Sequence, residues 1–413
     1  MLFPALRAPG TRRHENLDDR KSMNGRTPSI RRSEKRRFAF VVNSDSPIAS
    51  WSVLRNLQTQ FPDHEVDLIH VSDALKSSLP TLALSALEVL AQYPFDIAMG
   101  RKKLRNAVFR SKTVARFVQG LVHQTVSAET HDFVFQMQSL WSARVQGIPH
   151  FLFTDHTNLT HETYPLPDLG AIYNNGFLER EKAIYQNAAA VFTRSENVTR
   201  DVVDRYGAEQ ARVKCVYAGA NTETDEEGAK PVAKRDPNDK IVLFVGVDWE
   251  RKGGPDLVEA FEILFQRHKD ARLVVAGCQP EDLPEHLPVE VLGRLPNEAL
   301  AEHYARASVF CMPTLREPFG IVFTEAMSFG LPLVGTDIGA VPDFIVSDWN
   351  GYLVPPRDPP HLAEALSKLL DDPDLRATFG ARSKSLAQDR YNWPAVVGRM
   401  AERIEREIAA APA

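Results

Sequence analysis

A strand, a loop, a helix and a second strand are predicted within residues 307–335, and this stretch constrains the fold more than any other. The apolar run at 307–313 is short enough to be a buried strand. Gly330 and Pro332 are stop signals, so a helix that follows the loop and helix start at 314–321 ends there. Strands and helices that alternate in this way indicate a parallel α/β sheet.

The same stretch also carries chemistry. A helix that begins near Gly320 directs the free amides of Phe319, Gly320 and Ile321 into the loop, which makes an anion site. Glu325, inside the helix, can accept two hydrogen bonds from a diol such as a ribose. Glu317 lies on the loop and would meet another part of the same ligand. Amides for phosphate and carboxylates for hydroxyls together describe a sugar nucleotide, although the spacing alone also fits two ordinary surface acids.

The residues around the two acids resemble a known signature. The chain reads Glu317-Pro-Phe-Gly-Ile-Val-Phe-Thr-Glu325-Ala-Met and then Gly330-Leu-Pro-Leu-Val-Gly-Thr-Asp-Ile-Gly-Ala-Val-Pro-Asp343. This run resembles the retaining two-domain glycosyltransferases of family 4, and the resemblance extends through most of 240–393 and more loosely over 150–222. It implies the α/β GT-B fold, in which two Rossmann-like doubly wound parallel-sheet domains face each other across a cleft.

Length and composition agree with two or three ordinary globular domains. The 413 residues are 43% hydrophobic and 25% charged, and the net charge of −5 argues against a general nucleic-acid binder. No window approaches 18 apolar residues, and the N-terminus lacks the apolar core of a signal peptide. The three cysteines have no metal-ligand spacing and indicate reduced thiols in a cytoplasmic protein.

The chain divides at changes in composition. Residues 1–37 are basic and aperiodic, which predicts a disordered tail, and Met23 is an alternative start. Residues 38–222 are expected to form the first domain, and the polar stretch 223–240 a linker. Residues 241–393 would form the second domain. By the resemblance, the last helix, at 394–413, crosses back onto the first domain.

In the first domain, buried strands are predicted at 38–42, 67–71 and 133–135, and Phe95–Ala98 is interpreted as another. His156 follows a further strand at its carboxyl end, where open α/β sheets bind ligands. The resemblance implies that His156 faces the transferred sugar, and a purely structural histidine is the alternative.

The segment 101–117 is basic, and Leu104, Val108 and Phe109, with Phe117, fall along one helical side. One interpretation is peripheral contact with the inner face of a membrane, as in some members of the resembled family. The other is a core-facing stripe with a solvated basic face.

In the second domain, Arg251 and Lys252 precede a helix and are placed to meet a diphosphate. The resembled pattern has an arginine directly after the glycine at Gly246, where this chain has Val247, so Arg251 is assigned that role. The strand at 291–295 lies beside the nucleotide base in the resembled family, which implies base contacts from Arg294 and Leu295.

The resemblance therefore implies a retaining glycosyltransferase that uses a nucleoside-diphosphate sugar. Glu317, His156, Arg251 and Lys252 are the expected catalytic residues, and Glu325 with Phe319, Gly320, Ile321, Gly246, Arg294 and Leu295 the expected substrate-binding residues. The chain has no Asp-x-Asp motif, so neither a divalent metal nor another cofactor is expected, and the acceptor is a glycan, a lipid or a small molecule. A sugar-nucleotide epimerase, a phosphorylase with a pyridoxal lysine and a non-catalytic sugar-nucleotide-binding protein are alternatives. A dehydrogenase is disfavoured because no G-x-G-x-x-G follows a strand.

Overall fold

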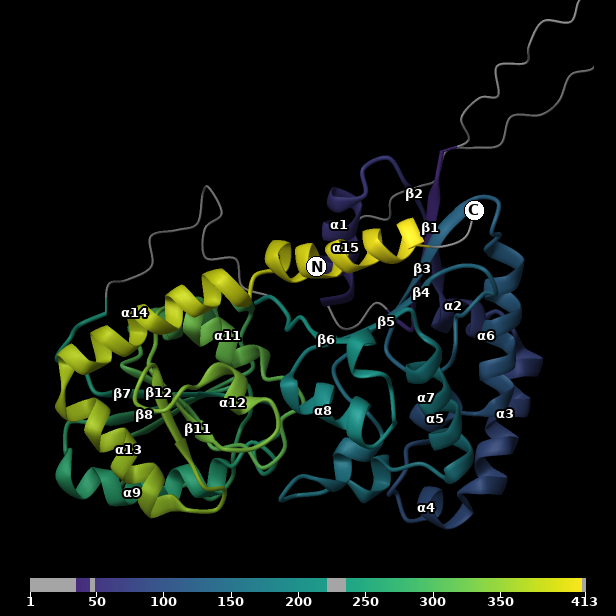
Figure 1. The fold of residues 1–413 in the computed structure, drawn as a ribbon. Coiled ribbons are helices and arrows are strands. Elements are labelled where there is room, and N and C mark those ends of the chain that lie inside the picture. Colours follow the sequence, from purple (N-terminus) through teal and green to yellow (C-terminus); the bar gives the residue numbers. More distant parts are fainter. Residues whose placement is uncertain (1–34, 45–48, 221–234, 411–413) are drawn as a thin grey trace, which may run out of the picture. The chain divides into compact units, whose positions relative to one another are not determined.

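Two six-stranded parallel sheets form the framework of the chain (Figure 1). The computed structural model describes residues 35–44, 49–220 and 235–410. The first sheet has the order β2-β1-β3-β4-β5-β6, and the second has the order β12-β11-β10-β7-β8-β9. The two Rossmann-like α/β sheets of a GT-B fold are thereby confirmed.

The first sheet and its helices alternate along the chain. Its strands are β1 (Arg37–Val42), β2 (Glu65–His70), β3 (His131–Met137), β4 (His150–Thr154), β5 (Ala190–Thr193) and β6 (Val213–Cys215). Its helices are α1 (Ala49–Gln60), α2 (Val71–Lys76), α3 (Leu79–Gln92), α4 (Pro94–Ala98), α5 (Leu104–Val108), α6 (Lys112–Thr125), α7 (Asn175–Asn187) and α8 (Glu196–Asp204). Short 3-10 helices are η1 (Leu159–Glu162), η2 (Leu169–Ala171) and η3 (Gln210–Arg212).

Side chains of the first sheet are buried on both faces, as expected for parallel strands. Phe38 and Phe40 of β1 pack on one face with α1, whereas Ala39 and Val41 pack on the other with α6. This two-sided burial explains why β1 is a continuous apolar run rather than an alternating one.

The second sheet has strands β7 (Ile241–Val245), β8 (Arg272–Ala276), β9 (Val289–Gly293), β10 (Val309–Met312), β11 (Leu333–Thr336) and β12 (Gly351–Val354). Its helices are α9 (Gly254–Arg267), α10 (Asn297–Arg306), α11 (Ile321–Ser328), α12 (Val341–Phe344), α13 (Pro359–Asp371) and α14 (Pro373–Arg390). The predicted strand, loop, helix and strand of 307–335 are therefore β10, the loop, α11 and β11.

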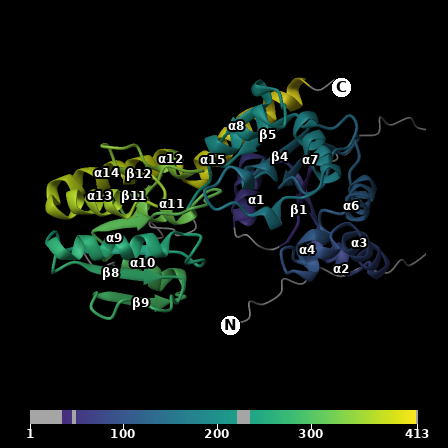
Figure 2. The ribbon, with the colours of Figure 1, turned by 90° about the horizontal axis from the view of Figure 1, so that it is seen from below.

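The last helix, α15 (Trp393–Ala410), packs on α1 and β5 of the first sheet, as predicted (Figures 1 and 2). The guanidinium of Arg399 donates to the carbonyl of Val216 at 2.8 Å, and that of Arg403 donates to the carbonyl of Ala211 at 2.7 Å. Trp393 lies against Gly219, where a Cβ would be only 2.6 Å from the indole. The C-terminal segment is thus fixed to the end of the first domain.

One prediction about the first domain is wrong. Phe95–Ala98 is in the helix α4, because Pro94 occupies its first turn and its residues are not paired in the sheet. For 101–117 the structure agrees with the core-facing stripe: Val108 is 4% exposed, and Leu104, Phe109 and Phe117 pack against the same core cluster. Residues 1–34 of the predicted tail and 221–234 of the predicted linker region lie outside the described residues.

Candidate active site

Each sheet has a cavity at the carboxyl ends of its strands, at the point where the strand order reverses. In the first sheet this point lies between β1 and β3, and in the second between β7 and β10. Loops that leave adjacent strands in opposite directions open a crevice there, which is where open α/β sheets bind ligands. We call the two sites the first-sheet cavity, of about 400 Å³, and the second-sheet cavity, of about 390 Å³.

The second-sheet cavity gathers six of the predicted residues. Its lining includes Arg251, Lys252, Glu317, Phe319, Gly320 and Ile321, together with Pro318, Val322 and Arg316. Four further lining residues, Asp155, His161, Asp168 and Arg194, come from the first domain. The loop after β7 and the loop after β10 therefore meet at one site, although 65 positions separate Lys252 from Glu317.

Gly320 sets the start of α11. Its φ of 90° lies in the left-handed region, and a Cβ there would be 2.9 Å from the Phe323 ring and 3.2 Å from Glu317 Cγ. Only glycine meets both conditions without strain. No side chain caps this helix, so the amides at its N-terminus, next to Phe319, are available to an anion in the cavity.

The two predicted cations are held in different ways. Arg251 donates from Nε to Asp248 at 3.0 Å and from Nη1 to the carbonyl of Arg316 at 2.8 Å. The ammonium of Lys252 forms an ion pair with the carboxylate of Glu317, and both residues are buried. Burial lowers the pKa of Lys252, and the charge of Glu317 opposes that shift.

Sequence reasoning missed two ion pairs at this cavity. Arg316 pairs with Asp168 at 3.0 Å, and Arg194 pairs with Asp155 at 3.4 Å. The four lining cations thus each have an acidic partner, which keeps them oriented in the absence of a ligand. No motif marks these residues in the sequence, and Asp168 belongs to an irregular loop.

Four predicted substrate-binding residues do not line the second-sheet cavity. Glu325 is 6% exposed and accepts a hydrogen bond of 2.9 Å from the hydroxyl of Tyr304, and burial raises its pKa to about 7. Gly246 packs against the side chain of Lys252: a Cβ on Gly246 would be 3.1 Å from Lys252 Cγ. Arg294 and Leu295 follow β9 and are absent from the lining. Their ligand contacts remain predictions.

His156 lies in the first-sheet cavity, beside a second histidine that the sequence analysis did not single out. The rings of His156 and His161 are 4.1 Å apart, and His161 also lines the second-sheet cavity. Burial lowers the pKa of His161 to about 4 and that of His156 well below its usual value. Both imidazoles are therefore neutral near pH 7 and can exchange hydrogen bonds with hydroxyl groups.

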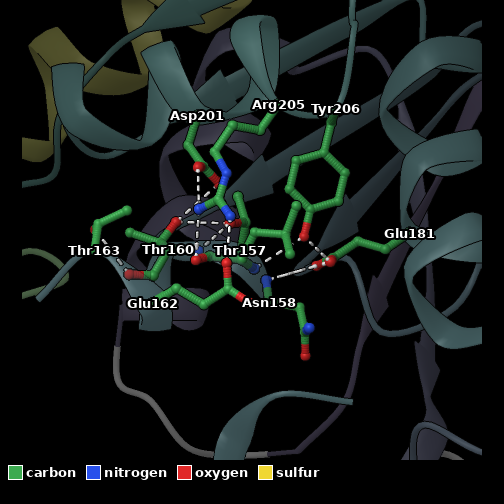
Figure 3. A network of polar contacts seen from close by, with 10 residues as sticks. Thr157, Asn158, Thr160, Glu162, Thr163, Glu181, Asp201, Arg205 and Tyr206 are labelled. Atoms are coloured by element: carbon green, nitrogen blue, oxygen red, sulfur yellow. Dashed lines mark hydrogen bonds and ion pairs between the residues drawn. The ribbon is translucent and has the colours of Figure 1, made fainter. Parts of the chain in front are cut away.

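A buried polar network fixes the turn that carries these histidines (Figure 3). Asp201 of α8 accepts from Thr160 at 3.0 Å and from Thr157. Glu181 of α7 accepts from the amide of Asn158 at 3.2 Å and from the hydroxyl of Tyr206. Two helices thereby anchor the segment between His156 and His161.

Several buried polar atoms in the first-sheet cavity have no hydrogen-bond partner among the described residues. They are both ring nitrogens of His156, Nδ1 of His161, Nδ2 of Asn158 and Oδ1 of Asn43. Such atoms are costly to bury unpaired, so a ligand rich in hydroxyl groups suits this cavity. Among the residues that the structure describes, no cluster of His, Cys, Asp or Glu could hold a metal ion.

Comparison with known proteins finds a family that matches most of the second domain. Residues 225–386 match the model of the family described as glycosyl transferases group 1. The chain carries a glycosyltransferase domain of this family. A D-inositol 3-phosphate glycosyltransferase of Corynebacterium urealyticum is 29% identical over 64% of this chain and 66% of its own length. One of Kribbella flavida is 30% identical over 52% of this chain and 55% of its own. The chain thus spans less than two thirds of either relative.

Solved glycosyltransferase structures share the fold. Sucrose-phosphate synthase from Thermosynechococcus elongatus superposes with a TM-score of 0.64 and 18% identity over 91% of this chain and 100% of that one. HepE from Anabaena, solved in complex with UDP and glucose, superposes with a TM-score of 0.59 and 17% identity over 89% of this chain and 99% of that one. At these identities the likeness shows the GT-B fold alone.

Proposed function

We propose that the protein transfers a sugar from a nucleoside-diphosphate sugar to a hydroxyl group of an acceptor, with retention of anomeric configuration. The observation that carries this proposal is the second-sheet cavity, which brings together Arg251, Lys252, Glu317 and the uncapped start of α11. Cations and helix amides suit a diphosphate, and a carboxylate beside them suits sugar hydroxyls. The Anabaena protein solved with UDP and glucose supports a donor of this class.

In this mechanism the diphosphate leaving group gains charge as the bond to the sugar breaks. Arg251 and Lys252 would stabilise that charge, and the amides around Phe319–Ile321 would position it. Glu317, which is paired with Lys252 in the structure, would exchange this partner for the sugar hydroxyls. Without an assigned carboxylate nucleophile, attack from the face of the leaving group is the proposed route, with a leaving-group phosphate oxygen accepting the acceptor's proton.

We place the acceptor in the first-sheet cavity. The unpartnered atoms of His156, His161 and Asn158 suit a compact molecule with several hydroxyl groups. The relative from Corynebacterium urealyticum is named for such an acceptor, D-inositol 3-phosphate. Because His161 lines both cavities, it lies between the proposed acceptor and the proposed donor. His156, in its neutral form, would accept or donate a hydrogen bond to a sugar hydroxyl.

We further propose a cytoplasmic location, because the three cysteines are free thiols and such proteins are typical of a reducing compartment. No helix of the described residues is long and apolar enough to cross a membrane. Peripheral contact at 101–117 would use the exposed cations Arg101, Lys103 and Arg105 rather than the buried stripe. Exposed Leu87 and Phe95 of the neighbouring helices would add apolar area. Co-sedimentation with anionic but not neutral vesicles is expected, and equal binding to both would contradict this contact.

A thermal-shift screen against a panel of nucleoside-diphosphate sugars tests the proposed function. A donor present at 100 times its dissociation constant stabilises the folded protein by about 2.7 kcal/mol. We expect a raised melting temperature with at least one donor, and Arg251→Gln should reduce the shift. Arg272→Gln is the matched control, because Arg272 lies at the amino end of β8, outside the cavity. A panel without any shift would contradict the proposal.

A further inference from the structure

A third cavity, of about 590 Å³, lies in the first domain and has an unusual charge pattern. It is lined by α6, by the loop after β3 and by α7, and four cations face it: Lys112, Arg116, Arg144 and Arg180. Its lining contains no aspartate or glutamate among the described residues. None of its lining residues lines the first-sheet or second-sheet cavity, so we call it the basic cavity.

Two of the cations converge on one point. A Cβ at Gly176 would be 3.9 Å from Lys112 Cε and 4.0 Å from Arg180 Nη1, so these side chains approach each other across Gly176. Two like charges near one point repel each other unless an anion lies between them. The basic cavity therefore brings cations together without an acid in its lining.

The partners of Arg180 support this description. Its guanidinium donates to the carbonyls of Gly176 at 2.7 Å and Arg110 at 2.5 Å, which orient the group but leave its charge unpaired. Burial lowers the pKa of Arg180, and the charge of Glu88 opposes that shift without an ion pair between the two side chains. Glu88 accepts from the backbone amide of Lys112 at 2.8 Å. That carboxylate is occupied by the start of α6, where it also accepts from the amide and hydroxyl of Thr113.

One residue of the lining carries a donor without a partner. Trp141 lines the basic cavity and is 1% exposed, and its indole Nε1 has no hydrogen-bond partner among the described residues. An indole N–H can only donate, so an acceptor atom is needed to satisfy it.

We propose that the basic cavity binds an anion that carries two or more phosphate groups. A single surface cation binds phosphate weakly and is screened by salt, whereas four cations around one cavity act together on a multivalent anion. Guanidinium groups bind phosphate through two parallel hydrogen bonds, which favours phosphate over a spherical anion. The volume is within the range of ligand sites, about 300–1,000 Å³. A soluble polyphosphorylated molecule and a phosphorylated lipid headgroup share this chemistry.

One hydrogen bond, from Arg180 to Arg110, connects the basic cavity to the first-sheet cavity. Arg180 of the basic cavity holds the carbonyl of Arg110, and the side chain of Arg110 lines the first-sheet cavity. An anion that draws Arg180 toward itself would act on this hydrogen bond. Occupancy of the basic cavity is therefore linked to the position of a cation in the proposed acceptor site.

Calorimetric titration with inorganic pyrophosphate tests the proposal, and every protein in the titration carries Arg251→Gln, which weakens diphosphate binding in the second-sheet cavity. The variant Lys112→Gln/Arg116→Gln removes two cations of the basic cavity, and Arg101→Gln/Lys103→Gln removes two exposed cations elsewhere on the same segment. We expect the first pair to weaken pyrophosphate binding at least tenfold and the second pair to leave it unchanged. Equal affinities for all three proteins, or no binding by the protein with Arg251→Gln alone, would overturn the proposal.

Gly176→Glu provides a second variant that is expected to fold. No atom lies closer than 3.4 Å to the new Cβ, and an acid in the first turn of α7 is favoured by the helix dipole. Its carboxylate would occupy the cations, so pyrophosphate binding should be lost while the melting temperature is kept. Retained binding in a folded Gly176→Glu protein would contradict the assignment.

Vesicles distinguish the two sources of phosphate. Vesicles of phosphatidylcholine with and without phosphatidylinositol bisphosphate, whose headgroup carries several phosphate groups, are sedimented with the protein, alone and with pyrophosphate. Binding that needs Lys112 and Arg116 and is displaced by pyrophosphate supports a headgroup. Pyrophosphate binding without vesicle binding supports a soluble anion. Because binding of pyrophosphate is measured without a sugar donor, loss of the proposed glycosyl transfer would leave this result unaffected.

Discussion

Lys252 and Glu317 form a buried ion pair between the loop after β7 and the loop after β10. Lys252 is 8% exposed and Glu317 is 4% exposed. The pair lies at the point where the strand order of the second sheet reverses. It joins the residue predicted to bind the diphosphate, Lys252, to the residue predicted to bind the sugar, Glu317. Each residue therefore neutralises the other.

Removal of one partner should cost more stability than removal of both. Lys252→Met or Glu317→Gln leaves a buried charge without its partner, which we expect to cost about 3 kcal/mol of unfolding free energy. The double variant should recover most of that loss, because no unpaired charge remains. Urea denaturation of the four proteins measures the coupling. Additive losses would show that the two side chains do not depend on each other.

Substitutions at Glu317 and Glu325 should affect nucleotide binding and turnover differently. Glu325, if it holds the ribose, contacts donor and free nucleotide alike, so Glu325→Gln should weaken nucleoside diphosphate binding by about 1–3 kcal/mol. Glu317, if it meets the sugar ring, does not contact free nucleotide. Glu317→Gln should not weaken that affinity, because it releases Lys252 from its ion pair, and it should lower turnover.

Calorimetry and a turnover assay on both variants decide between these roles. Glu302→Gln, on the exposed part of α10, is a matched control without a predicted ligand contact. A reversed pattern would mean that the ligand lies the other way round in the cavity. Effects no larger than those of the control would remove both assignments.

The raised pKa of Glu325 predicts a pH dependence. Its ordinary value is 4.5, and burial raises it to about 7 in the folded state. The folded protein therefore keeps a proton that the unfolded chain releases, so this contribution to stability is complete below pH 4.5 and is lost as the pH rises through 7. Glu325→Gln should flatten the fall in melting temperature between pH 4.5 and about 7, the interval between the two pKa values.

Glu181 and Asp343 also have pKa values raised to about 7, so the wild-type slope is a sum and the variant should remove only part of it. An unchanged slope in Glu325→Gln would contradict the buried state of this carboxyl. Nucleotide affinity should move the other way, because the ionised carboxylate is the better acceptor for a ribose diol.

Transfer should not need a divalent metal, because Arg251 and Lys252 are placed to balance the charge of the diphosphate. We expect the rate with excess EDTA to equal the rate without it. A complete loss of turnover that magnesium or manganese restores would reject this prediction.

The sequence was sufficient to predict those features that depend on local chemistry. The helix start is predicted near Gly320, and α11 begins at the next residue. The buried strands show as continuous apolar runs. Phe95–Ala98 misled because a short apolar run fits a strand or a helix, and Pro94 decided the outcome. Contacts between distant loops, such as that of Arg316 with Asp168, depend on how the loops meet and leave no spacing in the sequence.

The basic segment 101–117 also shows what local sequence patterns cannot predict. An apolar stripe at helical spacing cannot reveal whether it meets a membrane or a core, and in the folded chain Val108 is buried. The stripe also belongs to two helices, since Ser111 caps α6 after α5 has ended. Its cations Lys112 and Arg116 line the basic cavity together with Arg144 and Arg180, which lie elsewhere in the sequence. The spacing of residues within the segment therefore could not predict this cavity.

Phosphorus and proton NMR, recorded together on the purified protein with the donor found by thermal shift, test the central claim most directly. Inositol phosphate and other compact polyols serve as acceptors, and the signals of the nucleoside diphosphate and of the sugar product are followed with time. We expect nucleoside diphosphate to be released, faster with an acceptor than without one, and much more slowly by Glu317→Gln. The anomeric bond of the product should have the same configuration, axial or equatorial, as that of the donor. Binding of the donor without any release of nucleoside diphosphate, across the panel of acceptors, would contradict a glycosyltransferase and indicate a sugar-nucleotide-binding protein.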